Sequence, residues 1–96
     1  MPSDKDLALM NMAESLIRNG DPDRAERAVR SIKDKSFRDH GLMCLARDIA
    51  TASLRVDNRR YAKRLQRTAR RIAESIDSPV TKAEAMAHVE AAGEIR

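Results

Sequence analysis

The sequence predicts an all-α domain in which about five helices follow one another in antiparallel succession. One apolar pattern occurs twice, with corresponding positions 33 residues apart. The first copy is Leu9, Met12, Ala13 and Leu16, and the second is Leu42, Leu45, Ala46 and Ile49. A period of this length is typical of stacked α-hairpins, each of which cannot bury its apolar face alone. No segment alternates apolar and polar residues with a period of two, so no strands are expected.

The first hairpin is expected over residues 4–33. Ser3 is suited to cap a helix that runs to Asn19, and Gly20 ends that helix. Asp21 then caps a second helix whose first residue is Pro22, a position where the missing amide costs no hydrogen bond.

The second hairpin is expected over residues 36–76. Ser36 and Asp39 resemble a capping box, which would begin a helix that reaches about Leu54. Apolar and small residues cover roughly 220° of this helix, as only a central helix requires. Gly41 in its interior predicts the close approach of a neighbouring helix, because glycine there otherwise costs about 1 kcal/mol relative to alanine.

A long fourth helix, capped by Asp57, should extend to Ile76, and the Ser78–Pro79 pair should open a fifth helix over residues 79–95. In the fifth helix Glu90 and Glu94 occupy positions that are apolar in the first and third, as in the capping helix of a repeat array. The chain is therefore expected to be a single helical-repeat domain over residues 1–96. The predicted core includes Leu42, Leu45, Ala46, Ile49, Leu65, Ile72 and Val89.

Composition narrows the class of protein. The net charge is +4, and the excess lies after Asp48, where ten basic residues stand against six acidic ones. A single cysteine cannot form an internal disulfide, and no basic start leads into an apolar run. A cytoplasmic protein with no membrane association is expected.

The repeat resembles the tetratricopeptide family, with residues 5–55 matching best. The small residue of the first helix of each hairpin falls on Ala13 and Ala46, the turn glycine on Gly20, and the signature alanine of the second helix on Ala25. A HEAT-like array is the alternative. The resemblance implies a right-handed superhelix whose concave face binds a peptide or a helix. By register this face would present Leu7, Met10, Glu14, Arg18, His40, Met43, Arg47 and Thr51, with Glu84, Ala87 and Ala91 from the fifth helix.

Two of these residues have a second interpretation. Methionine adapts its shape to varied partners, which suits Met10 and Met43 to a binding groove. Both could instead fill gaps at the edge of an alanine-rich core.

The fourth helix has a basic face opposite its apolar stripe. Its members are Arg59, Arg60, Lys63, Arg64, Arg67, Arg70 and Arg71. Such a face could bind phosphates or an acidic protein, or could be plain solvated surface. No aromatic residues alternate with these cations to stack on bases, so only weak nucleic-acid binding is expected.

No chemical motif of comparable clarity exists. A thiol at Cys44 stands one turn after His40, but no third group orients the pair. Two histidines and one cysteine do not make a zinc site, and no glycine-rich phosphate loop is present. We therefore expect a non-enzymatic adaptor that binds a protein segment or a second copy of itself, with no cofactor, metal or small-molecule substrate. The alternative is a protein that binds nucleic acid or an acidic partner through the basic face.

Overall fold

The computed structural model describes residues 1–95, and all of its regular structure is helical. The five helices are α1 (Asp4–Arg18), α2 (Pro22–Arg30), α3 (Lys35–Ser53), α4 (Arg59–Glu74) and α5 (Pro79–Ile95). The predicted all-α class is confirmed, and no strand occurs among these residues.

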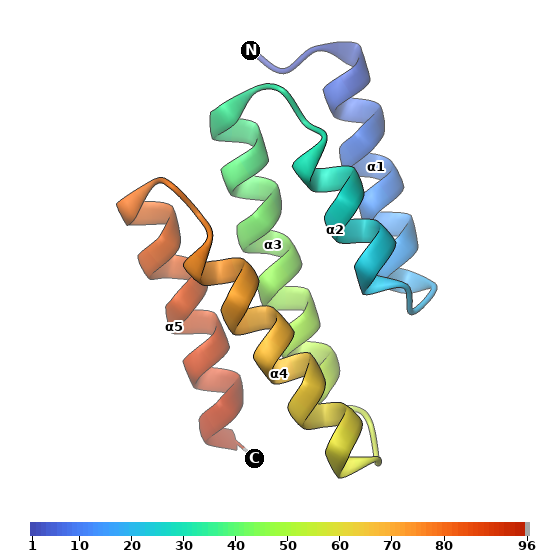
Figure 1. Cartoon of the computed structure of the whole chain (residues 1–96), viewed down its shortest axis with the longest axis vertical. Coiled ribbons are helices and arrows are strands. Elements are labelled where there is room, and N and C mark those ends of the chain that lie inside the picture. Colours follow the sequence, from blue (N-terminus) through green and yellow to red (C-terminus); the bar gives the residue numbers. More distant parts are fainter. Residues whose placement is uncertain (96) are drawn as a thin grey trace.

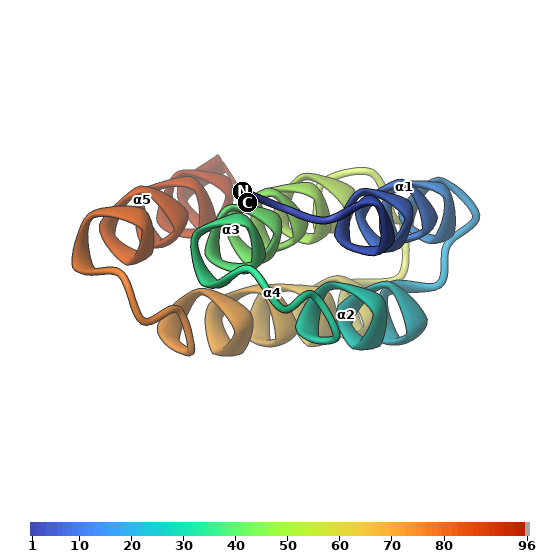
Figure 2. The ribbon, with the colours of Figure 1, turned by 90° about the horizontal axis from the view of Figure 1, so that it is seen from above.

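Successive helices alternate between two layers. Figure 2 shows α1, α3 and α5 in one layer and α2 and α4 in the other. The chain therefore forms two hairpins, α1–α2 and α3–α4, followed by α5 (Figure 1). The result is a flat slab with principal extents of 39 × 29 × 14 Å.

The third helix is the centre of the molecule. It packs against each of the other four helices, whereas α1 and α5 do not contact each other. This explains why its sequence is apolar around most of its circumference, as predicted. All seven predicted core residues are buried, from Leu42 on α3 to Val89 on α5.

Small side chains let the helices approach closely around α3. Ala25, Ala46 and Ala69 are completely buried. At Gly41 a Cβ atom would lie 2.6 Å from Met10 Cε and 3.0 Å from Val29 Cγ1. The close approach that the sequence predicted at Gly41 is therefore confirmed, and two different helices make it.

The helix starts confirm three predicted caps and correct two others. Ser78 precedes α5 as predicted, and its Oγ accepts from the Thr81 amide at 3.4 Å. Ser3 and Asp21 cap α1 and α2 as predicted, and Gly20 has a φ of +78°. However, α3 is capped by Asp34, whose Oδ1 accepts from the Phe37 amide at 2.9 Å, so Ser36 lies within the helix. Asn58 caps α4 in place of Asp57, since its side-chain oxygen accepts from the Tyr61 amide at 3.0 Å.

The fourth helix also ends earlier than predicted, at Glu74 instead of Ile76. The chain leaves the helix at Ser75, where the amide makes its last helical bonds, yet Ile76 remains buried. Apolar periodicity therefore continued past the helix end because the following turn also packs on the core.

Two buried aspartates hold each hairpin to the helix that follows it. Asp6, 3% exposed, accepts from the backbone amides of Lys33 at 3.0 Å and Asp34 at 3.1 Å, in the turn between α2 and α3. Asp39, 5% exposed, accepts from the Ser78 amide at 3.2 Å, just before α5. These aspartates are separated by the same interval as Leu9 and Leu42, so the repeat includes a polar tie as well as an apolar register.

The predicted capping box of Ser36 and Asp39 is absent because Asp34 caps α3, so that Phe37 and not Asp39 is the third residue of the helix. The carboxylate of Asp39 accepts from the Ser78 amide before α5 instead. When Leu42 and Leu45 are aligned with Met86 and Val89, the position of Asp39 corresponds to Ala83 in α5. Alanine has no carboxylate, so α5 does not repeat the tie.

Replacing Ala46 tests the close packing. Ala46 is fully buried, so Ala46→Glu would bury an unpaired charge and should lower the free energy of unfolding by more than about 4 kcal/mol. Urea denaturation followed by circular dichroism measures the effect. Ala91→Glu, at an exposed position of α5, is the control and should change stability by less than about 0.5 kcal/mol. Equal losses for the two variants would contradict the packing described here.

The aspartate tie predicts a contrast between two residues of one helix turn. Hydrogen bonds from the Lys33 and Asp34 amides lower the pKa of Asp6, so the charged carboxylate is the form that stabilises the fold. Asp6→Asn should lower the thermal midpoint more than Asp4→Asn, because Asp4 is exposed in the same turn. The difference should be largest near neutral pH and should shrink as the pH falls through the lowered pKa of Asp6. Equal midpoints at neutral pH would show that the tie is not stabilising.

Candidate binding surfaces

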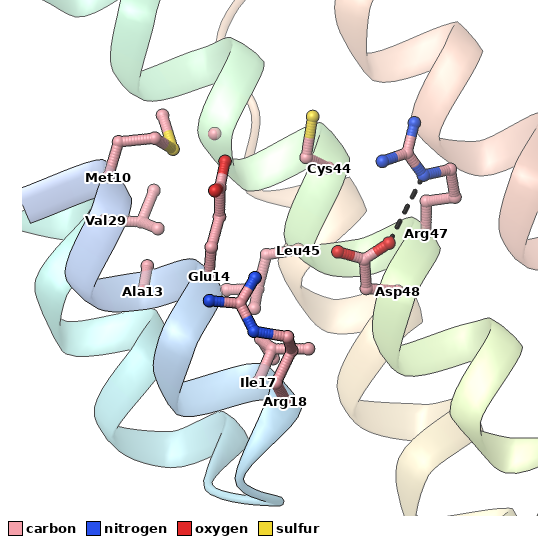
Figure 3. Close-up of a pocket in the computed structure, with 11 residues that line it drawn as sticks. Met10, Ala13, Glu14, Ile17, Arg18, Val29, Cys44, Leu45, Arg47 and Asp48 are labelled. Atoms are coloured by element: carbon pink, nitrogen blue, oxygen red, sulfur yellow. Dashed lines mark hydrogen bonds and ion pairs between the residues drawn. The ribbon is translucent and has the colours of Figure 1, made fainter. Parts of the chain in front are cut away.

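A small cavity opens between α1 and α3, with a volume of about 270 Å³. Apolar and small groups form much of its lining, contributed by Met10, Ala13, Ile17, Val29, Gly41 and Leu45. Polar and charged side chains complete it, from Glu14, Arg18, Cys44, Arg47 and Asp48 (Figure 3). Arg47 and Asp48 form an ion pair at 3.4 Å. The cavity thus combines an apolar surface with charges of both signs, which suits a short peptide segment.

The residues predicted for the concave face are distributed over four places, one of which is the core, where Met43 lies. Met10, Glu14, Arg18 and Arg47 line the cavity together. His40 borders a separate shallow hollow with Phe37 and the start of the chain. Leu7, 46% exposed, and Thr51, also exposed, lie on the surface outside both.

Met43 is buried, with 9% of its surface exposed. It is therefore a core residue, which is the second interpretation that the sequence left open, and it is not accessible to a partner. Met10 is partly buried against Gly41 but still lines the cavity.

Register reasoning found Arg47 but missed the other four residues that α3 contributes to the cavity, Gly41, Cys44, Leu45 and Asp48. Their equivalents one repeat earlier do not line the cavity from α1. A cavity between two helices takes different faces from each of them. These residues could therefore have been predicted from the face of α3 that carries Gly41. They could not have been predicted from the register of α1.

The thiol and imidazole near the cavity do not form an activated pair. Cys44 Sγ lies 3.6 Å from His40 Nε2. Burial raises the pKa of the Cys44 thiol, which keeps it protonated at neutral pH. Among residues 1–95, no group of three or more His, Cys, Asp and Glu side chains is placed to hold a metal ion.

Charge is distributed unevenly between the two layers. The α2 and α4 segments contain ten basic and three acidic residues, whereas α1, α3 and α5 together contain six basic and eight acidic residues. The basic face predicted on α4 thus belongs to a cationic layer, and α2 continues it.

One residue of the predicted basic face, Arg71, is paired with an acidic side chain. Arg71 donates to both carboxylate oxygens of Glu26 on α2, at 2.9 and 2.8 Å. Glu26 also accepts from Arg30 at 2.8 Å, and Arg30 donates to Ser75 Oγ at 3.0 Å. Since α2 and α4 do not pack directly against each other, these polar contacts join the two hairpins across the cationic layer. Arg71 is therefore a structural residue.

The other six members of the basic face, Arg59 to Arg70, are exposed and form no ion pair with another residue of the described range 1–95. Four of them line a groove of about 620 Å³ between α4 and α5. Its lining is Arg59, Ala62, Lys63, Gln66, Arg67, Arg70 and Gly93. Arg60 and Arg64 lie outside this groove. The basic face is therefore divided into a groove wall on the α5 side and an outer edge.

Comparison with protein-family models, curated proteins and solved structures finds no match to this chain. In the part of the chain that the structure covers, no helix is both long enough and apolar enough to cross a membrane.

The Glu26 cluster predicts a defined pH dependence. Hydrogen bonds from Arg71 and Arg30 lower the pKa of Glu26 from 4.5 to about 2. The charged form is favoured in the folded state, so its stabilisation is full above pH 4.5 and is lost as the pH falls through about 2. At pH 6 we expect Glu26→Gln to be less stable than the parent by about 1 kcal/mol, a value reduced by solvent screening.

Chemical denaturation at several pH values measures this difference, which should disappear near pH 2. Glu74→Gln, at the exposed end of α4, is the control and should stay close to the parent throughout. A Glu26→Gln difference that stayed constant down to pH 2 would contradict the assignment to this carboxylate.

Proposed function

We propose that this protein is a non-enzymatic binding module that takes a peptide or helix of a partner, or a second copy of itself, on the layer formed by α1, α3 and α5. The observation that supports this function is the cavity between α1 and α3. It brings together Met10, Glu14, Arg18 and Arg47 from the expected concave face. Its apolar lining supplies contact area, and charges of both signs at its edge supply orientation and specificity.

We further infer that the array is tetratricopeptide-like. Three features support this inference: the alternation of helices between two layers, the apolar register that recurs from α1 to α3, and the equivalent ties made by Asp6 and Asp39. Arrays of this kind present an extended face to their ligands.

A second candidate function is binding of an acidic partner or of nucleic acid by the cationic layer. The observation in its favour is that four cations converge on the α4–α5 groove without ion-pair partners in the described residues. Uncompensated cations along one helix repel one another by a few tenths of a kcal/mol per neighbouring pair, and an anionic ligand would relieve this repulsion.

Site-specific crosslinking tests the first proposal. A photo-crosslinking amino acid placed at Arg47, beside the cavity, should give a discrete crosslinked product in the native cell, identified by mass spectrometry. The same residue at Asn11, which is exposed on α1 and does not line the cavity, is the control and should give none. Glu14→Lys in the Arg47-labelled protein should reduce the product at least about tenfold, because it reverses a charge at the cavity edge.

Sedimentation velocity at micromolar concentration distinguishes the two occupants. A product of twice the protein mass, together with a dimer in sedimentation, identifies a second copy. A heterologous product with a monomer identifies a partner protein. Equal crosslinking from Arg47 and Asn11, or none from Arg47 in a protein that is monomeric, would overturn the proposal.

A further inference from the structure

We propose that the groove between α4 and α5 is a docking site for an acidic helix of another protein, which would lie beside α4 as a further member of the α2/α4 layer. This inference rests on the second candidate function, for which it names the ligand, and it concerns a different surface from the α1–α3 cavity. Three observations carry it: the charge of the groove, its place in the array, and the glycine in its wall.

The cations of the groove form a regular row. Arg59, Lys63, Arg67 and Arg70 follow one another at spacings of four, four and three residues, so the row is about 16 Å long with about 6 Å between neighbours. Acidic residues at the same spacings on a second helix repeat at the same interval. Two such rows can form several Arg–carboxylate pairs at once, and these charge-assisted contacts are the stronger kind of polar interaction.

The place of the groove follows the plan of the array. Each helix of the α2/α4 layer packs against two helices of the other layer: α2 contacts α1 and α3, and α4 contacts α3 and α5 (Figure 2). A helix in the groove would contact α5 and lie beside α4. It would therefore continue the alternation of layers that the rest of the chain establishes.

The α5 wall of the groove is formed by a residue without a side chain, Gly93. It is exposed in the last turns of α5 and lines the groove, and a Cβ atom there would lie 3.2 Å from Gln66 Oε1. Gln66 is itself held by a hydrogen bond of 3.2 Å from its Nε2 to Ser53 Oγ. Gly93 therefore lets Gln66 of α4 lie close against α5, and it adds no side chain of its own to the groove.

An acidic helix fits these observations better than a nucleic acid does. No aromatic side chain lines the groove to stack on a base. Glu90 stands three residues before Gly93, on the same side of α5, and its carboxylate would repel a phosphate backbone. A partner helix can place a basic or neutral residue opposite Glu90, whereas every unit of a phosphate backbone is negative.

Fluorescence polarisation with a designed probe tests the proposal. The probe is a labelled, helix-stapled peptide, long enough to span the whole cationic row as a helix. It is made of alanine and glutamine, with glutamates in one stripe at the spacing of that row. Its control has the same composition with the glutamates spread around the helix. We expect the stripe peptide to bind at least about tenfold more tightly than the control peptide at about 150 mM salt.

Two protein variants with equal net charge distinguish binding in the groove from a general attraction to the positive charge of the protein. The groove variant replaces Arg59, Lys63, Arg67 and Arg70 with Gln, and the matched variant replaces Arg27, Arg55, Arg60 and Arg64 with Gln. All eight residues are exposed or lie at the surface, so both variants should remain helical by circular dichroism. The groove variant should bind the stripe peptide at least about tenfold more weakly than the parent, and the matched variant less than about threefold more weakly.

Gly93→Met then tests for a seated helix without changing the charge. Methionine favours the helix more than glycine does, so the fold should be retained, but its side chain would occupy the groove. We expect a loss of at least about tenfold in affinity for the stripe peptide, since a diffuse attraction between charges would not be sensitive to this side chain.

Three results would overturn the proposal: equal losses in the two charge variants, unchanged affinity in Gly93→Met, or tighter binding of an RNA or DNA oligonucleotide of matched length than of the stripe peptide under the same salt. None of them depends on the Arg47 crosslink at the α1–α3 cavity. Failure at the groove and failure of the proposed peptide-binding function are therefore separate outcomes.

Discussion

Close packing around α3 is the constraint on which the rest of this structure depends. The helix contacts all four others, and small residues such as Gly41 and Ala46 bring their backbones near. An alanine-rich core buries little apolar area per residue, so apolar burial alone holds the hairpins together weakly. Polar contacts between hairpins supplement it, through Asp6, Asp39 and the Glu26 cluster.

These polar contacts also determine which charges remain available. Of the seven cations predicted on α4, Arg71 is held by Glu26 and serves the joint between hairpins. The other six have no such partner within residues 1–95, and four of them gather along α5. The paired cation and the four groove cations therefore lie on two different edges of the basic face, one toward α2 and the other toward α5.

The sequence predicted the fold well and the site in part, for identifiable reasons. The five helices were identified from several signals: a one-sided apolar stripe for α4, a wide apolar arc for α3, and the Ser78–Pro79 pair for α5. The caps at Ser3 and Asp21 were predicted correctly. The cap of α4 was predicted one residue too early, at Asp57, because Asp and Asn have similar capping preferences and local sequence does not place the helix start between them. Met10 and Arg47 were found from register, but the α3 side of the cavity and the α4–α5 groove depend on how helices pack, which register does not describe.

The unequal charge of the two layers has a consequence for motion in solution. A slab only 14 Å thick, with its cations concentrated in the α2/α4 layer and more acidic than basic residues in the other, has a dipole moment directed across its thinnest dimension. Near an anionic surface it experiences a torque within roughly one Debye length, about 8 Å at physiological salt. The molecule therefore turns its cationic side forward before contact, and its opposite side, with the α1–α3 cavity, is left facing the solvent.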